Sequence, residues 1–246
     1  MSARSSARQD GAGDALAAPT PRGRLLAAAE RLFAEHGWAG VSVRALTAAA
    51  DVNLASLHYH FGSKESLLEE IFASRAAPIA AERLRRLADC AEAAGRPPLL
   101  EQILDAFLRP ALTLGMEARF GGPTFVKLRA RLATEPEGIG RRILAAAFDE
   151  SSRRFLEALE RALPEVPRRD LEWRFHFLLG AMVYTMADTG RIQALTDGAC
   201  DPGRAEDALH HMIPFFAAGF RSAPGSATAR RRRGRTNDRV KETSRT

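Results

Sequence analysis

The histidine–tyrosine–histidine cluster at residues 58–60 is the first stretch of the chain whose residue types suggest chemistry. Imidazole groups bind metal ions and transfer protons, so His58 and His60 could form a metal or acid–base site. In a helix, however, residues two positions apart point to nearly opposite sides, and only a strand would put both on one face. The preceding residues lack the alternation of a strand, and no Asp, Glu or Cys stands between Leu54 and Ser63 to complete a site. We therefore expect no metal, no cofactor and no catalytic residue in this protein.

Closely spaced helix signals precede the cluster. Thr20 and Pro21 predict the start of a first helix, as N-cap and first helical residue, and Gly37 predicts its end. Ser42 then predicts the start of a second, short helix.

The cluster itself falls on a third short helix. Asn53 can cap a helix from about residue 54 to 60, and Ser63 can cap a fourth helix directly afterwards. The second and third helices are separated by a three-residue turn at 51–53. This arrangement is typical of a helix-turn-helix unit, whose second helix enters the major groove of DNA.

The two faces of this third helix differ in character. Leu57 and Phe61, four residues apart, are predicted to face inwards. The small residues at 55–56 would let the backbone approach base edges, and Tyr59 and His60 would reach phosphate oxygens. The cluster is therefore interpreted as part of a DNA-contacting surface.

Two basic residues flank the unit. Lys64 stands at the start of the fourth helix, where its ammonium and the free backbone amides could meet a phosphate. Arg44, early in the second helix, is a further candidate for phosphate or base contact. The alternative interpretation of each is a charged side chain that is exposed to solvent and has no binding role.

Composition limits the class of protein. The chain has 246 residues, 46% of them hydrophobic, and no apolar run long enough for a membrane span. The N-terminus lacks the apolar segment of a secretion signal, and two cysteines are too few for a disulfide framework. These features predict a cytoplasmic protein without a membrane partner. The formal net charge of +6 lies entirely in residues 229–246, which hold eight basic and two acidic side chains.

The remainder of the chain follows a helical pattern. The segment 171–187 is apolar nearly all round, and a stripe of apolar residues runs along 205–220. Two such helices could form half of a four-helix bundle with a second subunit, so a homodimer is expected. A monomeric core would explain the same pattern.

At these residues the sequence resembles the TetR family of bacterial transcriptional regulators. The similarity runs from about residue 20 to 68, through LFAEHG and VSVRALTAAADVNLASLHYHFGSKESLL. It implies a homodimer with paired helix-turn-helix domains on a pseudo-palindromic double-stranded DNA operator, and a larger helical domain that binds a small-molecule inducer. It also implies a recognition helix at 53–60, with Lys64 and Arg44 on phosphates.

The sequence departs from the family pattern at three positions. Asp51 stands where glycine is usual, although Asp tolerates a left-handed turn better than most residues. Thr47 replaces a usual alanine. Leu54 stands where a polar or basic residue is common, so that contact is lost or becomes apolar, for example to a thymine methyl group. The predicted DNA-contacting residues are Ser42, Arg44, Asn53, Leu54, Ala55, Ser56, His58, Tyr59, His60 and Lys64.

A second resemblance covers the C-terminal part. The phrases EWRFHFLLGA and MIPFFAAGFRS are similar to TetR-type repressors that sense long-chain fatty acids or their CoA esters. An effector site would combine adaptable apolar residues with Arg129, which would meet an acidic head group. Plain core packing is the alternative for most of these positions, and a surface ion pair is the alternative for Arg129. The candidate ligand-binding residues are Phe107, Met116, Phe120, Phe125, Leu128, Arg129, Met182 and Met186.

The expected fold is all-α. An N-terminal three-helix DNA-binding domain with a helix-turn-helix (20–66) follows a disordered leader (1–19). A larger ligand-binding and dimerisation domain (67–222) precedes a disordered basic tail (223–246). The expected function is a repressor released from its operator by an apolar or acyl-type effector, with a fatty acid or acyl-CoA as candidate. An activator of the same fold is one alternative, and a small-molecule enzyme or lipid-binding protein is another.

Overall fold

The computed structural model describes residues 20–223 except 95–97, 115–116, 118–120, 136–137 and 188–189. The expected leader and nearly all of the expected basic tail lie outside these residues. The described part contains ten helices and no strand. The all-α prediction is therefore confirmed. The helices are α1 (Pro21–His36), α2 (Val43–Ala49), α3 (Leu54–Phe61), α4 (Lys64–Ala94), α5 (Leu100–Leu112), α6 (Gly122–Thr134), α7 (Gly138–Ala162), α8 (Arg168–Ala187), α9 (Arg191–Leu195) and α10 (Ala205–Arg221).

The first three helices begin at the caps that the sequence predicts. The Thr20 hydroxyl accepts a hydrogen bond from the Gly23 amide, and the Ser42 hydroxyl accepts one from the Ala45 amide. The Asn53 side chain caps α3 in the same way. Each cap satisfies a backbone amide that a helix start leaves without a partner.

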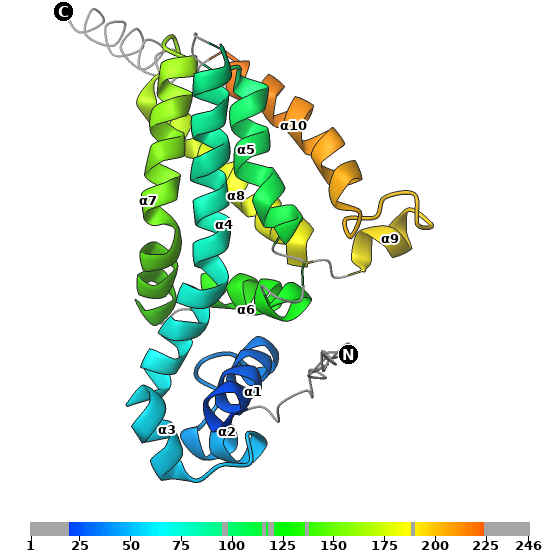
Figure 1. Cartoon of the computed structure of the whole chain (residues 1–246). Coiled ribbons are helices and arrows are strands. Elements are labelled where there is room, and N and C mark those ends of the chain that lie inside the picture. Colours follow the sequence, from blue (N-terminus) through cyan, green and yellow to red (C-terminus); the bar gives the residue numbers. More distant parts are fainter. Residues whose placement is uncertain are drawn as a thin grey trace, which may run out of the picture.

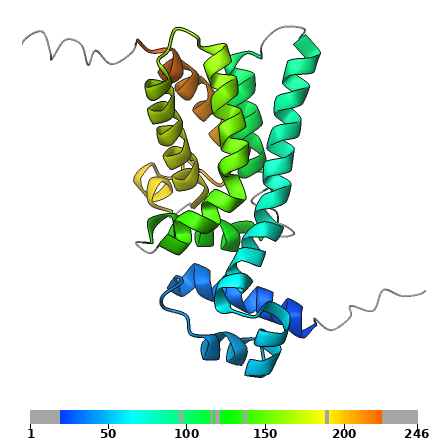
Figure 2. The same cartoon turned by 90° about the vertical axis from the view of Figure 1, so that its left-hand side faces the viewer.

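Helix α4 connects the two ends of the molecule. It starts beside α3 and runs upwards along α5 and α7, as Figures 1 and 2 show. Pro78 lies inside α4 and removes one amide donor from its hydrogen-bond ladder. Helix α6 lies between α1 and the upright helices and contacts both α1 and α8.

The buried side chains form two clusters. The lower cluster joins α1–α4 to α6 and to the first half of α7, through residues such as Phe72, Phe125 and Ile143. The upper cluster joins α5, α8 and α10 to the second half of α7. Because α6 shares the core of the helix-turn-helix end, a displacement of α6 must disturb that core.

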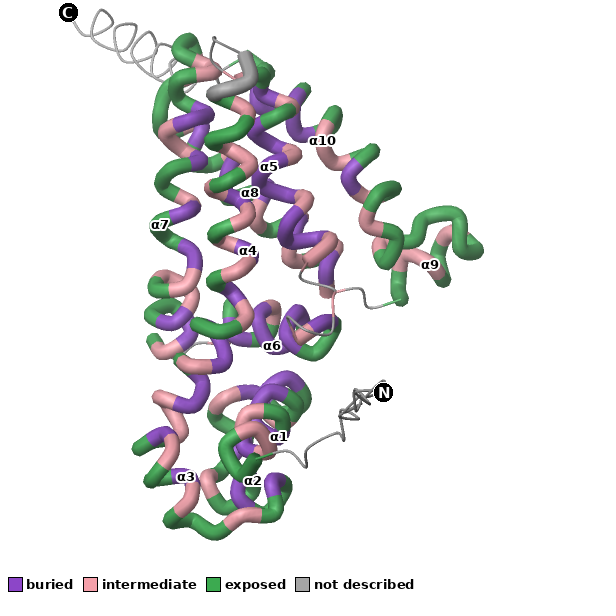
Figure 3. Tube along the Cα trace, viewed as in Figure 1, coloured by how far each residue is buried: buried purple, intermediate pink, exposed green. Residues whose placement is uncertain are grey.

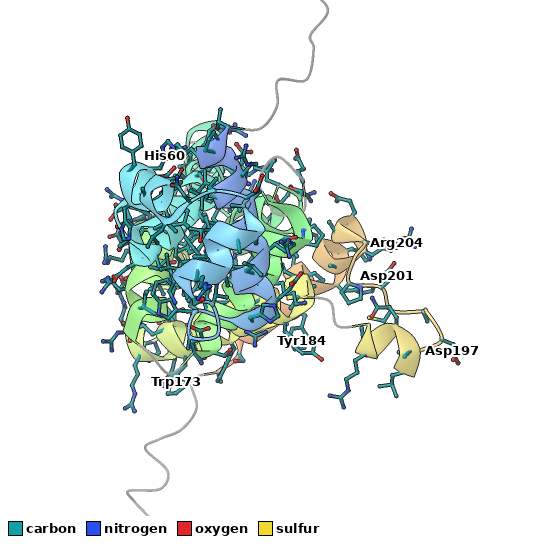
Figure 4. The ribbon with its side chains drawn as sticks, turned by 90° about the horizontal axis from the view of Figure 1, so that it is seen from below. His60, Trp173, Tyr184, Asp197, Asp201 and Arg204 are labelled. Carbon is teal, nitrogen blue, oxygen red and sulfur yellow. The ribbon has the colours of Figure 1, made fainter. Side chains whose placement is uncertain are left out.

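Helices α8 and α10 leave large apolar side chains exposed to solvent. Exposed stretches of α10 are coloured green in Figure 3. The exposed fractions are 53% for Trp173, 59% for Phe177, 60% for Tyr184 and 72% for Phe215. Trp173, Phe177 and Tyr184 follow one stripe of α8, since they are spaced by four and seven residues. Trp173 and Tyr184 project from the same side of the molecule in Figure 4.

Candidate DNA interface and effector cavity

One face of helix α3 is buried against the rest of the domain, and its opposite face is exposed. Leu57 is fully buried and Phe61 is nearly so, as the sequence predicts. The Gly62 carbonyl accepts a hydrogen bond of 2.9 Å from His58 Nδ1, so that imidazole caps the end of the helix. The side chains of Ser42, Asn53 and His58 thus already serve helix ends.

The outer face of α3 carries no charged side chain. Tyr59 is 85% exposed, Leu54 is 53% exposed, and Ala55 is also exposed. Ser56 and His60 are half-buried, and the His60 ring lies edge-on to the Tyr59 ring at 5.1 Å. The structure therefore brings small residues, a phenol and an imidazole onto one accessible surface at the end of the molecule.

The position of Lys64 differs from the expected phosphate contact. Its ammonium donates to the backbone carbonyls of Trp38 and Val41, both at 2.8 Å, and lies 3.9 Å from the centre of the Trp38 ring. The side chain is half-buried in the loop between α1 and α2. Lys64 ties the start of α4 to this loop, because two carbonyls and an aromatic face surround its charge.

A residue that the sequence did not single out holds the turn of the helix-turn-helix. Arg24 on α1 donates from Nε to the Ala50 carbonyl at 2.9 Å and from Nη2 to the Asp51 carbonyl at 3.1 Å. Asp51 adopts a positive φ of 51°, the left-handed conformation for which glycine is usual. The departure at Asp51 is therefore compatible with the turn.

Arg44 is the remaining basic candidate of the DNA-contacting set. It is exposed on α2 and forms no ion pair with the described residues. Arg22, by contrast, pairs with Glu70 and lies over the Phe61 ring. Arg44 is thus free to approach a phosphate or a base.

A cavity of about 830 Å³ lies between α6, α7 and α8. This volume is within the range of pockets for small molecules. Its apolar lining is Leu132, Ala133, Leu144, Ala145, Phe148, Leu179 and Val183. Its polar lining is Arg129, Glu135, Arg141, Asp149, Ser152 and His176.

Arg129 is a buried residue in the lining of this cavity. It is only 6% exposed, with its guanidinium 4.4 Å from the centre of the Phe148 ring and 4.0 Å from the sulfur of Met186. Burial lowers the pKa of Arg129 to about 10 because the charged form loses its hydration. The expected alternative of a surface ion pair is wrong for Arg129, since this side chain is buried.

The other candidate ligand residues that the structure describes do not line this cavity. Phe107, Phe125, Leu128, Met182 and Met186 are buried in the two cores. Aromatic contacts explain two of them: Phe107 packs against two phenylalanine rings of the upper core, and Phe125 packs against Phe72. Met116 and Phe120 lie outside the described residues.

The cavity is linked to the helix-turn-helix through the end of α6. Glu135 lines the cavity, and its Oε1 accepts a hydrogen bond of 2.6 Å from the Trp38 amide. Its Oε2 is buried and has no hydrogen-bond partner among the described residues. Arg131 Nη1 donates to the Glu35 carbonyl at 3.0 Å. Since the Trp38 carbonyl binds Lys64, a continuous set of contacts joins α6, the α1–α2 loop and α4.

An ion pair also connects α1 to α4, close to the start of α6. Glu30 of α1, which is buried, forms a two-point ion pair with Arg75 of α4, with its shorter distance at 2.9 Å. Gly121, at the start of α6 with a φ of 92°, passes so close to Glu30 that a Cβ atom there would clash with the carboxylate. Helices α1, α4 and α6 therefore meet at one buried charge pair.

Two family models match the chain. Residues 25–71 match the model for bacterial regulatory proteins of the tetR family, and residues 105–219 match the tetracyclin repressor-like C-terminal domain. The first match includes the helix-turn-helix, and the second includes the cavity-lining helices α6 to α8. The chain belongs to the TetR family of transcription regulators.

Solved structures share the fold at low identity. PfmR, a TetR family transcriptional regulator from Thermus thermophilus, is 22% identical with a TM-score of 0.52, over 83% of this chain and 98% of that chain. The fatty acid degradation regulator FadR from Bacillus halodurans is 14% identical with a TM-score of 0.54, over 83% and 98%. A TetR-family protein from Syntrophomonas wolfei is 14% identical with a TM-score of 0.55, over 84% and 97%. No curated protein matches.

Two further findings concern the described residues alone. None of their helices is long and apolar enough to cross a membrane. No group of three or more His, Cys, Asp or Glu side chains gathers among them in a way that could hold a metal ion.

Proposed function

We propose that this TetR-family protein is a dimeric repressor that a small apolar or acyl-type effector releases from its operator. The observation that carries this proposal is the position of α6, which lines the cavity on one side and shares the core of the helix-turn-helix on the other. A ligand that displaces α6 therefore acts on the DNA-binding end.

In this proposal, α3 reads the operator. Ser56, together with Leu54 and Ala55, contacts base edges, and Tyr59 and His60 contact phosphates. Arg44 supplies the charged phosphate contact. The support is that the α3 residues among these are exposed or half-buried on the outer surface of that helix, and that Arg44 is exposed on α2. The caps formed by Ser42, Asn53 and His58 hold these helices in place.

Tyr59 and Ser56 allow this division of roles to be tested. Replacing Tyr59 by phenylalanine removes a phosphate contact, so we expect weaker binding to operator and random DNA alike. Replacing Ser56 by alanine should instead change the base preference. Fluorescence anisotropy with both DNAs at two salt concentrations measures each effect. Equal losses on specific and random DNA for both variants would count against direct readout by Ser56.

The proposed dimer forms through α8 and α10. Their uncovered aromatic residues form the kind of apolar patch that marks a protein interface. Pairing two copies would create a four-helix bundle and hold two recognition helices about 34 Å apart or slightly more, as a pseudo-palindromic operator requires.

Coupling follows the contacts of α6. An effector in the cavity presses on α6, whose end holds Trp38 through Glu135, and Trp38 in turn binds Lys64 at the start of α4. The spacing of the two recognition helices changes as α4 moves. A difference of about 1–3 kcal/mol between the two states weakens DNA binding by roughly 5- to 150-fold.

The enzyme alternative is less well supported. The cavity lining contains the three residue types of a hydrolase triad, in Ser152, His176 and Asp149. No hydrogen bond joins any two of them in the described structure, and the His176 ring packs near Trp173 and Phe177 instead. An activated nucleophile needs a base within hydrogen-bond reach.

The direct test is to recover the small molecule that copurifies with the protein and add it to the complex with promoter DNA. We expect an apolar or acyl-type compound that releases the DNA and so raises transcription from that promoter. An effector that strengthens binding, or raises transcription while the protein stays bound, would favour an activator.

A further inference from the structure

Two arginines are buried in the described structure without an acidic partner. Arg83 of α4 is 1% exposed and Arg129 of α6 is 6% exposed. Neither forms an ion pair with a described residue. Buried charges in proteins are normally paired, since their hydration is lost on folding. Two buried arginines that lack an acidic partner indicate that a negatively charged ligand completes the site.

Among the described residues, Arg83 contacts neutral groups. Its Nε donates to the Phe107 carbonyl at 2.8 Å, and its Nη2 contacts the Met182 sulfur at 3.2 Å. Its guanidinium lies 3.9 Å from the centre of the Phe107 ring. These contacts orient the side chain but do not neutralise it.

The two arginines form one electrostatic unit. Their sulfur partners, Met182 and Met186, are four residues apart on α8, so the two guanidinium groups contact successive turns of that helix. Burial lowers the pKa of Arg83, and repulsion from Arg129 lowers it further. The two guanidinium groups therefore repel each other, and an anion beside Arg129 relieves this repulsion.

The cavity leads to one of these two arginines, Arg129. Among the lining residues Arg141 and Asp149 are exposed and Arg129 and Phe148 are buried, and this difference in burial indicates that the cavity has its mouth at the exposed pair and its inner end at the buried pair. The rest of the lining is mostly apolar, together with Glu135, Ser152 and His176. A ligand that fits has an anionic group at the end that enters first and an apolar body behind it.

We propose that the effector is a free carboxylic acid that enters carboxylate first and places its carboxylate on Arg129, while Arg83 adds attraction from behind the cavity wall. This assignment rests on the proposed function and narrows its effector class. A planar guanidinium binds a carboxylate through two parallel hydrogen bonds. A CoA ester is neutral at its thioester and carries its charges on the bulky nucleotide, so its acyl chain would leave Arg129 unpaired.

The test compares the full-length protein with three probe series: octanoate, dodecanoate and hexadecanoate, their methyl esters, and dodecanoyl-CoA. Isothermal titration calorimetry gives the dissociation constant for each. We expect at least one acid to bind about 10-fold or more tightly than its own methyl ester, as a hydrogen bond to a charged group provides. The CoA ester should bind more weakly than the acid.

Variants locate the carboxylate. Arg129→Met should remove the preference for acid over ester, and Arg129→Lys should restore part of it because the charge returns. Arg83→Met should weaken acid binding by a smaller factor than Arg129→Met. Arg161→Met, on the exposed surface of α7 outside the cavity, is the matched control and should leave the preference unchanged. Thermal unfolding of each variant confirms that it is folded.

Several results would overturn the assignment. These are equal binding of acid and ester, tighter binding of the CoA ester, no binding of any acid, or retention of the preference in Arg129→Met. Loss of the preference in Arg141→Met rather than Arg129→Met would place the carboxylate at the mouth and refute the inward orientation. The proposed function is judged separately, by release of DNA with the copurified molecule.

Discussion

Replacing Arg129 by methionine should make the ligand-free protein more stable. Burial lowers the pKa of Arg129 to about 10, and a lowering of this size corresponds to about 3 kcal/mol of unfavourable free energy for the charged form. Because the folded pKa lies below the unfolded value, the folded state is penalised in full below pH 10. The penalty disappears as the pH rises from about 10 towards the higher pKa of the unfolded state. At neutral pH the arginine therefore destabilises the empty protein.

The favourable contacts of Arg129 reduce the expected gain. The guanidinium lies over the Phe148 ring, and such a contact contributes about 0.5–2 kcal/mol. Methionine preserves much of the side-chain volume and suits the apolar surroundings. We therefore expect the free energy of unfolding to rise by about 1–2 kcal/mol in Arg129→Met.

Urea unfolding of protein stripped of copurifying molecules measures this difference. The exposed-surface variant Arg161→Met is the control and should change by less than about 0.5 kcal/mol. A saturating acid should reverse the order, because ligand at about 100 times its dissociation constant adds about 2.7 kcal/mol to the wild type alone. A ligand-free Arg129→Met protein less stable than wild type would show that Arg129 serves the fold, and would refute the reasoning.

Three further predictions concern Lys64, α6 and α8. Lys64→Met should lower the free energy of unfolding by about 1.5–3 kcal/mol, as two hydrogen bonds from a charged group are lost. It should weaken DNA binding without changing the salt dependence, and a slope reduced by about 1 would instead indicate a phosphate contact. Arg131→Ala removes the bond from α6 to Glu35 and should reduce effector-induced release by about 2- to 30-fold, at an effector affinity unchanged in calorimetry. Unchanged release would exclude this route. Trp173→Glu should give a monomer in sedimentation velocity, and a persistent dimer would place the interface elsewhere.

Much of the helix-turn-helix could be predicted from local signals. The caps at Thr20, Ser42 and Asn53 act within three residues of themselves, so their effect is visible in the sequence. The hydrogen-bond partners of Lys64 could not be predicted in this way, because they lie in a loop 23 to 26 residues earlier in the chain. A charged side chain at a helix start suits a phosphate and a carbonyl pair equally well.

The effector site was predicted less completely, for a physical reason. Arg129 belongs to the predicted set and does line the cavity, but Arg83 was missed. Its neighbours Glu82, Arg85 and Arg86 form ion pairs on the surface of α4, so the local sequence is typical of a solvated helix. Only the packing of α5 and α8 over one turn of α4 buries Arg83. Apolar residues that line the cavity are of the same types as apolar residues of the core, so the sequence does not distinguish the two groups.

The central claim is that occupation of the cavity weakens the grip of α3 on DNA. It is tested most directly by the affinity of the wild-type protein for its operator at fixed salt, with and without a saturating effector. We predict an affinity about 5- to 150-fold lower with the effector, and the same factor for effector binding with and without operator DNA. An operator affinity that stays unchanged when the cavity is saturated would contradict the account.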